Sequence, residues 1–354
     1  MANKIAVISS GNGGQSMAAY FSYLGYSVAL YARDAERIEM FTSKRFTISG
    51  AVEGEAEVDI ISNDMGEVIR DAYLVMVTTP AQYHPIVARA MAPHLKDGQA
   101  VVLNPGRSFG TLTFSMVLDE CGCSAKILLG ETDTFTFTCR CPEIGRPQIY
   151  KIKDSVRLAA HDNSYGKKLL GILREIFSMY SLSESTLHTA FSNIGMIFHP
   201  LPLLMNITRI EAKEDFLFYM QGISPLVAGI LEKMDLERVS IANAYGVMVP
   251  SARQWLADCY GSRGDTLFER IQNTDAYRTV HAPTDMDTRY IFEDILTGCV
   301  PIACAGKAAG IKTDVINTTI KWASILYGRD FHAEGRNETL INFEAMKTKG
   351  ATHT

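Results

Sequence analysis

Residues 4–34 read KIAVISSGNGGQSMAAYFSYLGYSVALYARD and join two short apolar runs through a glycine cluster and a stretch of helical spacing. The cluster directly follows the first run and opens the helical stretch, as in a dinucleotide-binding βαβ unit. In such units, glycines permit the tight turn and let the backbone approach a pyrophosphate, which the N–H groups and positive dipole of the helix start hold. We therefore expect a dinucleotide to be bound by Gly11, Asn12, Gly13, Gly14, Gln15 and Ser16.

The first half of the chain continues this alternation. Short apolar runs recur between helical stretches as SVALYA, YLVMVTT, QAVVLNPG and KILLGET. Such runs are typical of parallel strands covered on both faces, so the pattern predicts an α/β fold with a doubly wound Rossmann sheet in residues 1–183. We expect PQIYKIK (147–153) and VRLAA (156–160) to extend this sheet at its edge.

The pattern changes in residues 184–354. Apolar residues recur there every three or four positions, as in LEKMDLERVSIANAYG (231–246) and TDVINTTIKWASILYG (313–328). This period is that of an amphipathic helix. The sequence therefore predicts an all-α C-terminal domain.

Composition narrows the function classes. The 354 residues are 47% hydrophobic, the balance of an ordinary globular protein. Their net charge of −5 excludes a broadly basic surface for nucleic acid or anionic lipid. The apolar runs are shorter than the roughly 20 residues of a membrane span, and the seven cysteines fall in no zinc-binding spacing. We expect a soluble cytoplasmic protein with reduced thiols, without a metal and without a membrane or nucleic-acid partner.

The second apolar run ends at Tyr31-Ala32-Arg33-Asp34. NAD enzymes usually place an acidic residue here for the ribose hydroxyls, whereas a nearby arginine suits the 2′-phosphate of NADP. Ala32 occupies the acidic position and Arg33 follows it, which favours NADP(H) over NAD(H). Two alternatives stay open: Asp34 binds the ribose, or Asp34 caps the next helix while Arg33 is solvated.

Two further strand ends carry candidate cofactor residues. Open α/β sheets bind ligands at the carboxyl ends of their strands, where this sequence has TTP (78–80) and NPG (104–106). We expect the nicotinamide side of the site to include Thr78, Pro80, His84 and Asn104. For the second segment, a plain turn is the alternative.

Residues 193–206 and 287–294 carry candidate catalytic groups. His199 lies in NIGMIFHPLPLLMN, and a histidine in such apolar surroundings is either a general acid–base group or a satisfied core residue. Arg289 and Glu293 stand four positions apart in DTRYIFED, so they form either an ordinary helix-surface pair or part of a site. Composition alone does not decide between these alternatives.

Several of these segments together resemble the opine dehydrogenase family. The resemblance is carried by FHPLPLLMN (198–206), QGISP (221–225) and TRYIFEDILTGCVP (288–301), and the glycine cluster, LNPG and GET…FTCR agree with it. It covers nearly the whole chain. It implies NAD(P)H-dependent reductive condensation of an α-keto acid, with pyruvate expected, and the amino group of an amino acid through an imine.

The resemblance also implies roles for individual residues. Matched by motif, His199 is the catalytic histidine, Asp294 is its partner carboxylate, and Arg289 is the group that binds the keto-acid carboxylate. The GET…FTCR stretch matches a region that lines the substrate pocket, and it contributes Glu131, Thr132 and Cys139. The expected partners are these small molecules, with a homodimer as an open alternative.

Two other functions stay open at this point. One is a simple NADP-dependent reductase of 2-keto acids or hydroxy acids in the same two-domain superfamily. Such relatives often rely on a lysine early in the second domain, whereas this chain has none between Lys168 and Lys213. The other is a non-catalytic dinucleotide sensor. The matched histidine, carboxylate and arginine favour the opine dehydrogenase interpretation.

Overall fold

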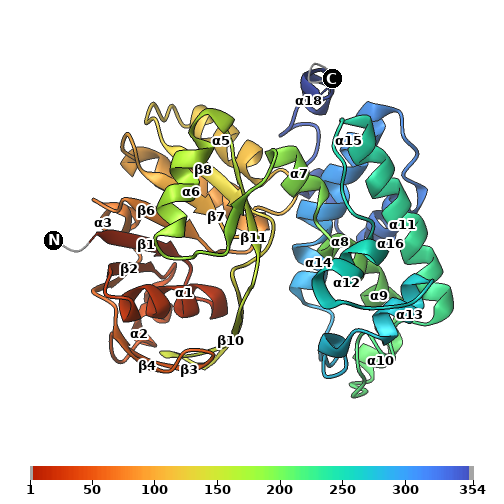
Figure 1. Cartoon of the computed structure of the whole chain (residues 1–354), viewed down its shortest axis with the longest axis horizontal. Coiled ribbons are helices and arrows are strands. Elements are labelled where there is room, and N and C mark those ends of the chain that lie inside the picture. Colours follow the sequence, from red (N-terminus) through yellow and green to blue (C-terminus); the bar gives the residue numbers. More distant parts are fainter. Residues whose placement is uncertain (1–2, 351–354) are drawn as a thin grey trace. The chain divides into compact units, whose positions relative to one another are not determined.

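Eight strands form the main sheet of the first half of the chain, within the residues 3–350 that this computed structural model describes (Figure 1). In sheet order they are β5 (Ile60–Ser62), β2 (Ser27–Tyr31), β1 (Lys4–Ile8), β6 (Leu74–Val77), β7 (Ala100–Leu103), β8 (Leu128–Thr132), β11 (Val156–Ala160) and β12 (Tyr180–Leu182). The first six are parallel, β11 runs antiparallel to β8, and β12 is parallel to β11. The strand order reverses beside β1, which is where open α/β sheets bind ligands.

Helices cover both faces of this sheet. Alternate residues of a strand point to opposite faces, so Ile5 and Val7 pack in one core with helices α1 (Asn12–Tyr23) and α6 (Gly166–Arg174). Ala6 and Ile8 pack in another core, which includes residues of α3 (Met65–Ile69), α4 (His84–Met91) and α5 (Gly110–Glu120). The predicted doubly wound Rossmann sheet is confirmed.

A second, four-stranded sheet packs against α1 on the side away from β1. Its strands, in order, are β4 (Gly54–Glu57), β3 (Arg45–Gly50), β10 (Arg146–Ile152) and β9 (Phe137–Glu143). VRLAA does extend the main sheet, as β11, but the same prediction for PQIYKIK was wrong. That segment becomes β10 because it forms an antiparallel hairpin with β9 through Gly145, whose φ of 78° suits a tight turn, and pairs with β3 on its other side.

The chain divides into two compact units, Met1–Thr189 and Ala190–Thr354. Helices make up the described part of the second unit, as predicted. After α7 (Thr186–Phe191), which crosses the boundary, they are α8 (Gly195–Phe198), α9 (Pro200–Met205), α10 (Ile207–Glu211), α11 (Pro225–Ala244), α12 (Ala252–Tyr260), α13 (Leu267–Gln272), the 3-10 helix η4 (Asp275–Tyr277), α14 (Arg289–Phe292), the π-helix η5 (Ile295–Cys299), α15 (Val300–Ala309), α16 (Asp314–Tyr327), α17 (Phe331–Glu334) and α18 (Phe343–Gly350).

A buried ion pair fixes α11, the long helix of this unit. Arg238 is fully buried and donates two hydrogen bonds to Asp235 Oδ1, at 2.9 and 2.7 Å, and one to the Pro250 carbonyl. The second carboxylate oxygen accepts from the Ala252 amide at 2.6 Å, which ties α11 to the start of α12. Among the described helices, none combines the length and hydropathy needed to cross a bilayer.

Candidate active site

The glycine cluster forms the turn from β1 into α1. Gly11 and Asn12 are exposed and Gly13 is half-buried, while Gly14 is fully packed. A Cβ on Gly14 would lie 1.7 Å from the Ser9 carbonyl oxygen, so this position requires glycine. The helix start thus presents backbone N–H groups that have no acceptor within the helix. This geometry fits the pyrophosphate of a dinucleotide.

Two polar side chains of the cluster attach it to the second sheet. Gln15 is buried; its Oε1 accepts from the Gly145 amide at 2.9 Å, and its Nε2 donates to the Ser10 carbonyl at 2.8 Å. Asn12 Oδ1 accepts from the Cys141 amide at 3.1 Å. Ser16, also buried, donates back to the Asn12 carbonyl. The turn is therefore held from both β1 and the β9–β10 hairpin.

The end of β2 carries the predicted cofactor-selecting residues. Arg33 and Asp34 are both exposed, and Arg33 Nε and Nη2 donate to the two carboxylate oxygens of Asp34 at 3.0 and 3.2 Å. Asp34 occupies the N-cap position of α2 (Ala35–Glu39), but its carboxylate makes no hydrogen bond to that helix. Sequence reasoning missed Arg37, which donates to the Ser10 carbonyl at 2.7 Å and brings a second guanidinium to this turn.

The residues predicted after β6 lie in contrasting surroundings. Thr78 is half-buried, and its hydroxyl lies 3.4 Å from the Ile8 carbonyl at the end of β1. Pro80 is exposed before the short 3-10 helix η1 (Ala81–Tyr83). His84 is fully buried at the start of α4.

Asn104 and Thr132 meet in one buried network at the ends of β7 and β8. Asn104 Nδ2 donates to Thr136 Oγ1 at 2.7 Å, and its Oδ1 accepts from the Thr136 amide at 3.2 Å. The Thr132 hydroxyl lies 2.8 Å from the Thr134 carbonyl and 3.3 Å from Asn104 Oδ1. These contacts fix the loop that follows β8.

Glu131 and Cys139, from the same stretch, are also buried. Glu131 accepts from the Thr111 amide at 2.7 Å and from the Thr189 hydroxyl at 2.5 Å. A Cβ on Gly106 would lie 2.5 Å from its Oε2, so glycine leaves room for this carboxylate. Burial raises the pKa of the Cys139 thiol, which therefore stays protonated at neutral pH.

In the helical unit, the structure brings His199 and Asp294 together. His199 Nδ1 lies 2.7 Å from Asp294 Oδ2; the carboxylate is fully buried and the ring is 13% exposed. His199 lies between α8 and α9, directly after Phe198. Pro200 then begins α9, where a proline is favoured because its fixed φ suits the first helical turn. The pair thus has the geometry of a histidine oriented and polarised by a carboxylate.

A π-helical turn places Asp294. The Cys299 amide donates to the Asp294 carbonyl at 2.9 Å, a bond that spans five residues instead of four. Pro301 has no N–H to donate four residues back, which favours such a local widening of the helix. A Cβ on Gly298 would lie 2.9 Å from the Met196 Cβ, so glycine lets the π turn pack closely on α8.

Tyr290 connects the pair with Arg289. Its ring stacks on the His199 ring, with centroids 4.0 Å apart and planes 7° apart, and the Arg289 guanidinium lies 5.3 Å from the same tyrosine ring. Arg289 is half-exposed, at 51%, and Nη1 lies 3.4 Å from Glu293 Oε2, so the helix-surface pair considered from the sequence does form. Sequence reasoning missed Tyr290, although it stands inside the RYIFED segment.

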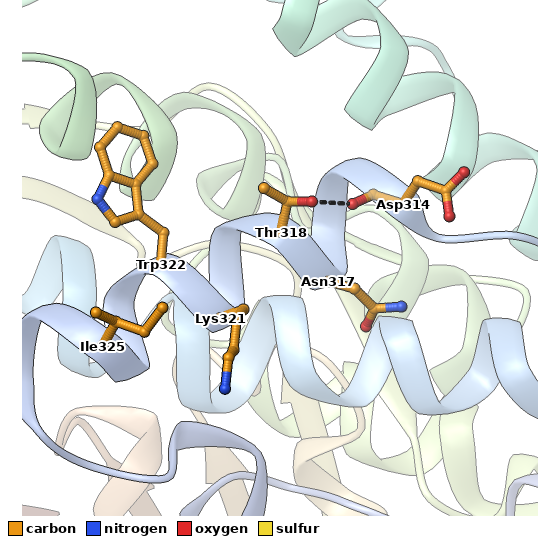
Figure 2. A pocket seen from close by; sticks show the side chains of 6 residues that line it. All are labelled: Asp314, Asn317, Thr318, Lys321, Trp322 and Ile325. Atoms are coloured by element: carbon orange, nitrogen blue, oxygen red, sulfur yellow. Dashed lines mark hydrogen bonds between the residues drawn. The ribbon is translucent and has the colours of Figure 1, made fainter.

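Figure 2 shows a pocket elsewhere in the helical unit, along one side of α16. Its lining residues are Asp314, Asn317, Thr318, Lys321, Trp322 and Ile325, and Thr318 donates its hydroxyl hydrogen to the Asp314 carbonyl at 2.7 Å. The pocket is wide open and contains none of the predicted site residues. The His199 region, by contrast, contains the paired titratable groups that proton transfer requires.

Comparison with known proteins identifies the family. Residues 182–327 match the model of the NAD/NADP octopine/nopaline dehydrogenase alpha-helical domain, and residues 4–111 match that of the NAD-dependent glycerol-3-phosphate dehydrogenase N-terminus. An opine dehydrogenase of Arthrobacter sp. (strain 1C) is 33% identical over 98% of this chain and 96% of its own length. The chain belongs to the opine dehydrogenase family. Octopine dehydrogenase of Pecten maximus is 24% identical over 95% of this chain and 93% of its own.

Solved structures agree on the fold of this family member. Octopine dehydrogenase in complex with NADH and agmatine aligns with a TM-score of 0.81 at 21% identity, covering 99% of this chain and 98% of that one. Yersinopine dehydrogenase with NADP⁺ bound aligns with a TM-score of 0.75 at 14% identity, covering 99% and 98%. The predicted family, fold and enzyme class are confirmed: this is an NAD(P)-dependent oxidoreductase that reductively condenses an α-keto acid with an amino acid.

Proposed function

We propose that His199 and Asp294 form the proton-transfer pair of this reaction, with Arg289 as the binding group for the keto-acid carboxylate. The observation that carries the assignment is the 2.7 Å hydrogen bond between His199 and a fully buried carboxylate. This hydrogen bond holds the ring in one orientation.

Proton transfer is assigned to Nε2 of His199. Nδ1 is hydrogen-bonded to Asp294, so in our proposal it is the opposite ring nitrogen that exchanges a proton with substrate. Tyr290 covers one face of the imidazole and limits its rotation. The amino group of the substrate must be neutral to attack the keto acid, and the ring can accept the proton that this group loses. It can return a proton as the imine is reduced.

Arg289 is suited to the keto-acid carboxylate by its geometry. Its guanidinium is half-exposed, and its contact with Glu293 is long, at 3.4 Å. A substrate carboxylate can bind the two parallel N–H groups of the fork, which is a stronger arrangement than one long contact. Pyruvate is the keto acid that we propose, since its small methyl group demands little from the surrounding residues.

The cofactor is proposed to bind at the β1–α1 turn through the backbone of Gly11, Asn12 and Gly13. When bound, its nicotinamide supplies the hydride. Buried residues of the predicted set would act by holding the loops around it: Gly14, Gln15, Ser16, His84 and Asn104. Thr78 and Pro80 would contact it directly, and the buried Glu131, Thr132 and Cys139 would shape the substrate side.

NADPH is proposed as the preferred cofactor. The support is the Arg33 guanidinium at the exposed end of β2, together with Arg37 four residues later. Arg33→Ala should raise the KM for NADPH by about tenfold, the loss of one charge-assisted hydrogen bond, and leave the KM for NADH nearly unchanged. Equal effects on both cofactors, or none, would refute the preference.

A direct assay tests the reaction. NADPH or NADH consumption is followed with pyruvate, alone and with a mixture of amino acids. Consumption only with amino acids supports the proposal; consumption with pyruvate alone would instead indicate a simple keto-acid reductase. No consumption with any substrate would indicate a dinucleotide sensor.

The roles of the site residues need variants. His199→Ala should lower kcat by roughly 10²–10⁴-fold, the usual contribution of a general acid–base group. The matched control is His281→Ala, because His281 also pairs with a carboxylate, Asp215, at 2.5 Å, but on the exposed surface. A loss of less than about tenfold in His199→Ala with binding intact would overturn the assignment.

We also propose a cytoplasmic location, because the seven cysteines stand at scattered positions that do not suggest a disulfide framework and thus suit a reducing compartment. A homodimer, left open by the sequence, stays a hypothesis that sedimentation of the purified chain can test.

A further inference from the structure

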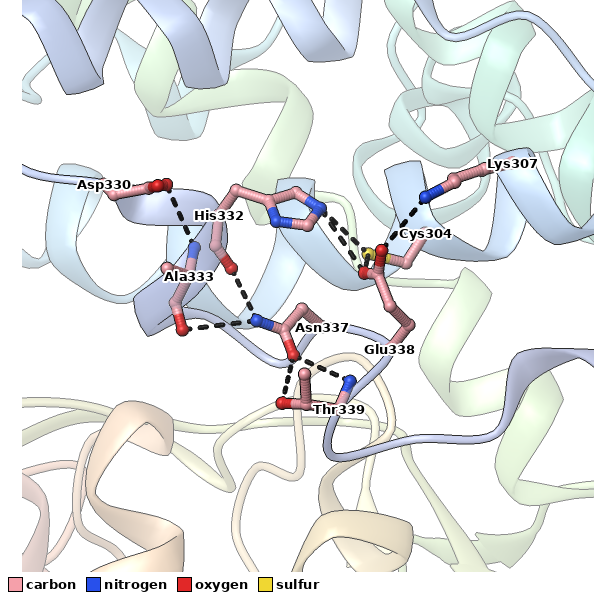
Figure 3. A network of polar contacts seen from close by, with 8 residues as sticks. All are labelled: Cys304, Lys307, Asp330, His332, Ala333, Asn337, Glu338 and Thr339. Atoms are coloured by element: carbon pink, nitrogen blue, oxygen red, sulfur yellow. Dashed lines mark hydrogen bonds and ion pairs between the residues drawn. The ribbon is translucent and has the colours of Figure 1, made fainter.

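A cysteine, a histidine and a glutamate meet in the helical unit away from the pair described above. Figure 3 shows Cys304, from α15, facing His332 and Glu338, from α17 and the loop after it. Cys304 Sγ lies 3.6 Å from His332 Nε2 and 3.1 Å from Glu338 Oε2, and the histidine and carboxylate atoms are 3.4 Å apart. One donor atom from each residue therefore faces a common point.

These three separations are close to those around a tetrahedral metal ion. Zinc binds cysteine sulfur at about 2.3 Å and histidine nitrogen or carboxylate oxygen at about 2.0–2.2 Å, which puts tetrahedral ligand atoms roughly 3.4–3.6 Å apart. The sulfur–nitrogen and nitrogen–oxygen distances already have these values. Only the sulfur–oxygen pair must open, by about 0.4 Å.

The backbone that carries the three residues is fixed independently of them. Asn337 is buried; its Nδ2 donates to the His332 carbonyl at 2.9 Å and its Oδ1 accepts from the Thr339 amide at 2.9 Å, so it holds the residues on both sides of Glu338 (Figure 3). A Cβ on Gly335 would lie 2.8 Å from Val300 Cγ1, and glycine thereby lets this loop lie directly on α15.

Lys307 orients the carboxylate. Its ammonium lies 3.1 Å from Glu338 Oε1, which leaves Oε2 directed toward Cys304 and His332. A polar neighbour that holds the outer oxygen of a ligand carboxylate is a common feature of metal sites. The side chains of His332 and Glu338 are 45% and 43% exposed, so water can reach the fourth tetrahedral position.

We propose that Cys304, His332 and Glu338 form a binding site for Zn²⁺ or a similar divalent transition metal. A thiolate, an imidazole and a carboxylate are the ligand types that zinc prefers, and three protein ligands plus water complete its usual coordination. The ion would tie α17 and the following loop to α15. The spacing of the three residues along the chain does not indicate such a site, which is why the sequence predicted no metal.

Cobalt titration of the full-length chain tests this proposal. After treatment with a chelator and dialysis, the protein is titrated with Co²⁺, whose absorption reports both thiolate ligation and tetrahedral geometry, and then with Zn²⁺ in competition. We expect saturation at one ion per chain with a sulfur-to-cobalt charge-transfer band. Zn²⁺ should displace the cobalt and raise the Tm.

Variants locate the site. Cys304→Ser should abolish the charge-transfer band, while His332→Gln should weaken Co²⁺ binding by at least about tenfold. Because the His332 ring is half-exposed, its replacement leaves the packing intact and keeps the test valid if the cysteine variant does not fold. The matched control is Cys121→Ser, which changes an exposed cysteine in the other unit. This variant should bind Co²⁺ with the same affinity as the unsubstituted chain. Failure of the natural chain to bind Co²⁺, or an unchanged band in Cys304→Ser, would overturn the proposal.

Discussion

Replacing Gly298 with alanine should separate the two halves of the proton-transfer pair. Gly298 belongs to the π turn Ile295–Cys299, which begins directly after Asp294. A Cβ on Gly298 would be 2.9 Å from the Met196 Cβ on α8. Ordinary contact between carbon atoms is about 3.5–4.0 Å. Because the position of a Cβ is fixed by the backbone, no rotation of a side chain relieves the clash. The π turn and α8 must move apart by about 0.6–1.1 Å.

That movement acts on His199, which directly follows α8. Its Nδ1 is 2.7 Å from Asp294 Oδ2, and the same displacement extends this distance to about 3.3–3.8 Å, beyond the usual limit of a hydrogen bond. We expect kcat to fall about 10²-fold, as for a misplacement of about 1 Å, with little change in KM. Overpacking should also lower the free energy of unfolding by about 1–3 kcal/mol.

The assay combines urea unfolding with steady-state kinetics of Gly298→Ala. The control is Gly229→Ala, because Gly229 lies in the helix α11 and nothing comes within 4 Å of a Cβ there. This control should keep full activity and gain about 0.5–1 kcal/mol. If Gly298→Ala kept the stability and the kcat of the unsubstituted protein, close packing of the π turn would not be what brings His199 and Asp294 together.

Three further predictions concern single residues. Burial, and after it the Arg157 charge, lower the pKa of His188 in the folded chain. As the pH falls, the unfolded chain therefore binds a proton at His188 before the folded chain does, so the free energy of unfolding should decrease below about pH 6.5. His188→Gln should show a smaller loss of Tm between about pH 7.5 and 5.5. Arg238→Met leaves the Asp235 carboxylate buried without its partner and should cost about 3–5 kcal/mol in urea unfolding; a cost below about 1 kcal/mol would contradict this. Arg289→Lys keeps the charge but loses the fork, so the KM for pyruvate should rise about tenfold while the KM for NADPH stays constant.

The Rossmann half was predictable because its signals are local. Each buried strand is a short apolar run, and the glycine cluster stands next to the strand and helix that it joins. The second sheet was missed for the opposite reason. Its β3 strand has alternating buried and exposed residues and pairs Gly50 with Ile149, which lies far along the chain. No local pattern specifies that partner, although the alternation of Phe46 and Ile48 could have indicated a strand.

The candidate site divides in the same way. His199 and Asp294 are 95 positions apart, so their contact does not follow from spacing and was expected only through the family resemblance. The π turn and the stacking of Tyr290 on His199 were not predicted, because both depend on how helices pack. Gly298 and Pro301, close together in a helical segment, were the available signal for an irregular turn.

The hydrogen bonds that Asn12 and Gln15 accept from the β9–β10 hairpin bear on protein engineering. Exchanging the first βαβ segment with that of a relative is an obvious route to a chimera with altered cofactor choice. In this protein such an exchange would remove two side chains whose hydrogen-bond donors lie more than a hundred positions later in the sequence. Residues 137–152 would have to travel with residues 4–34, so the smallest exchangeable module here is discontinuous in sequence.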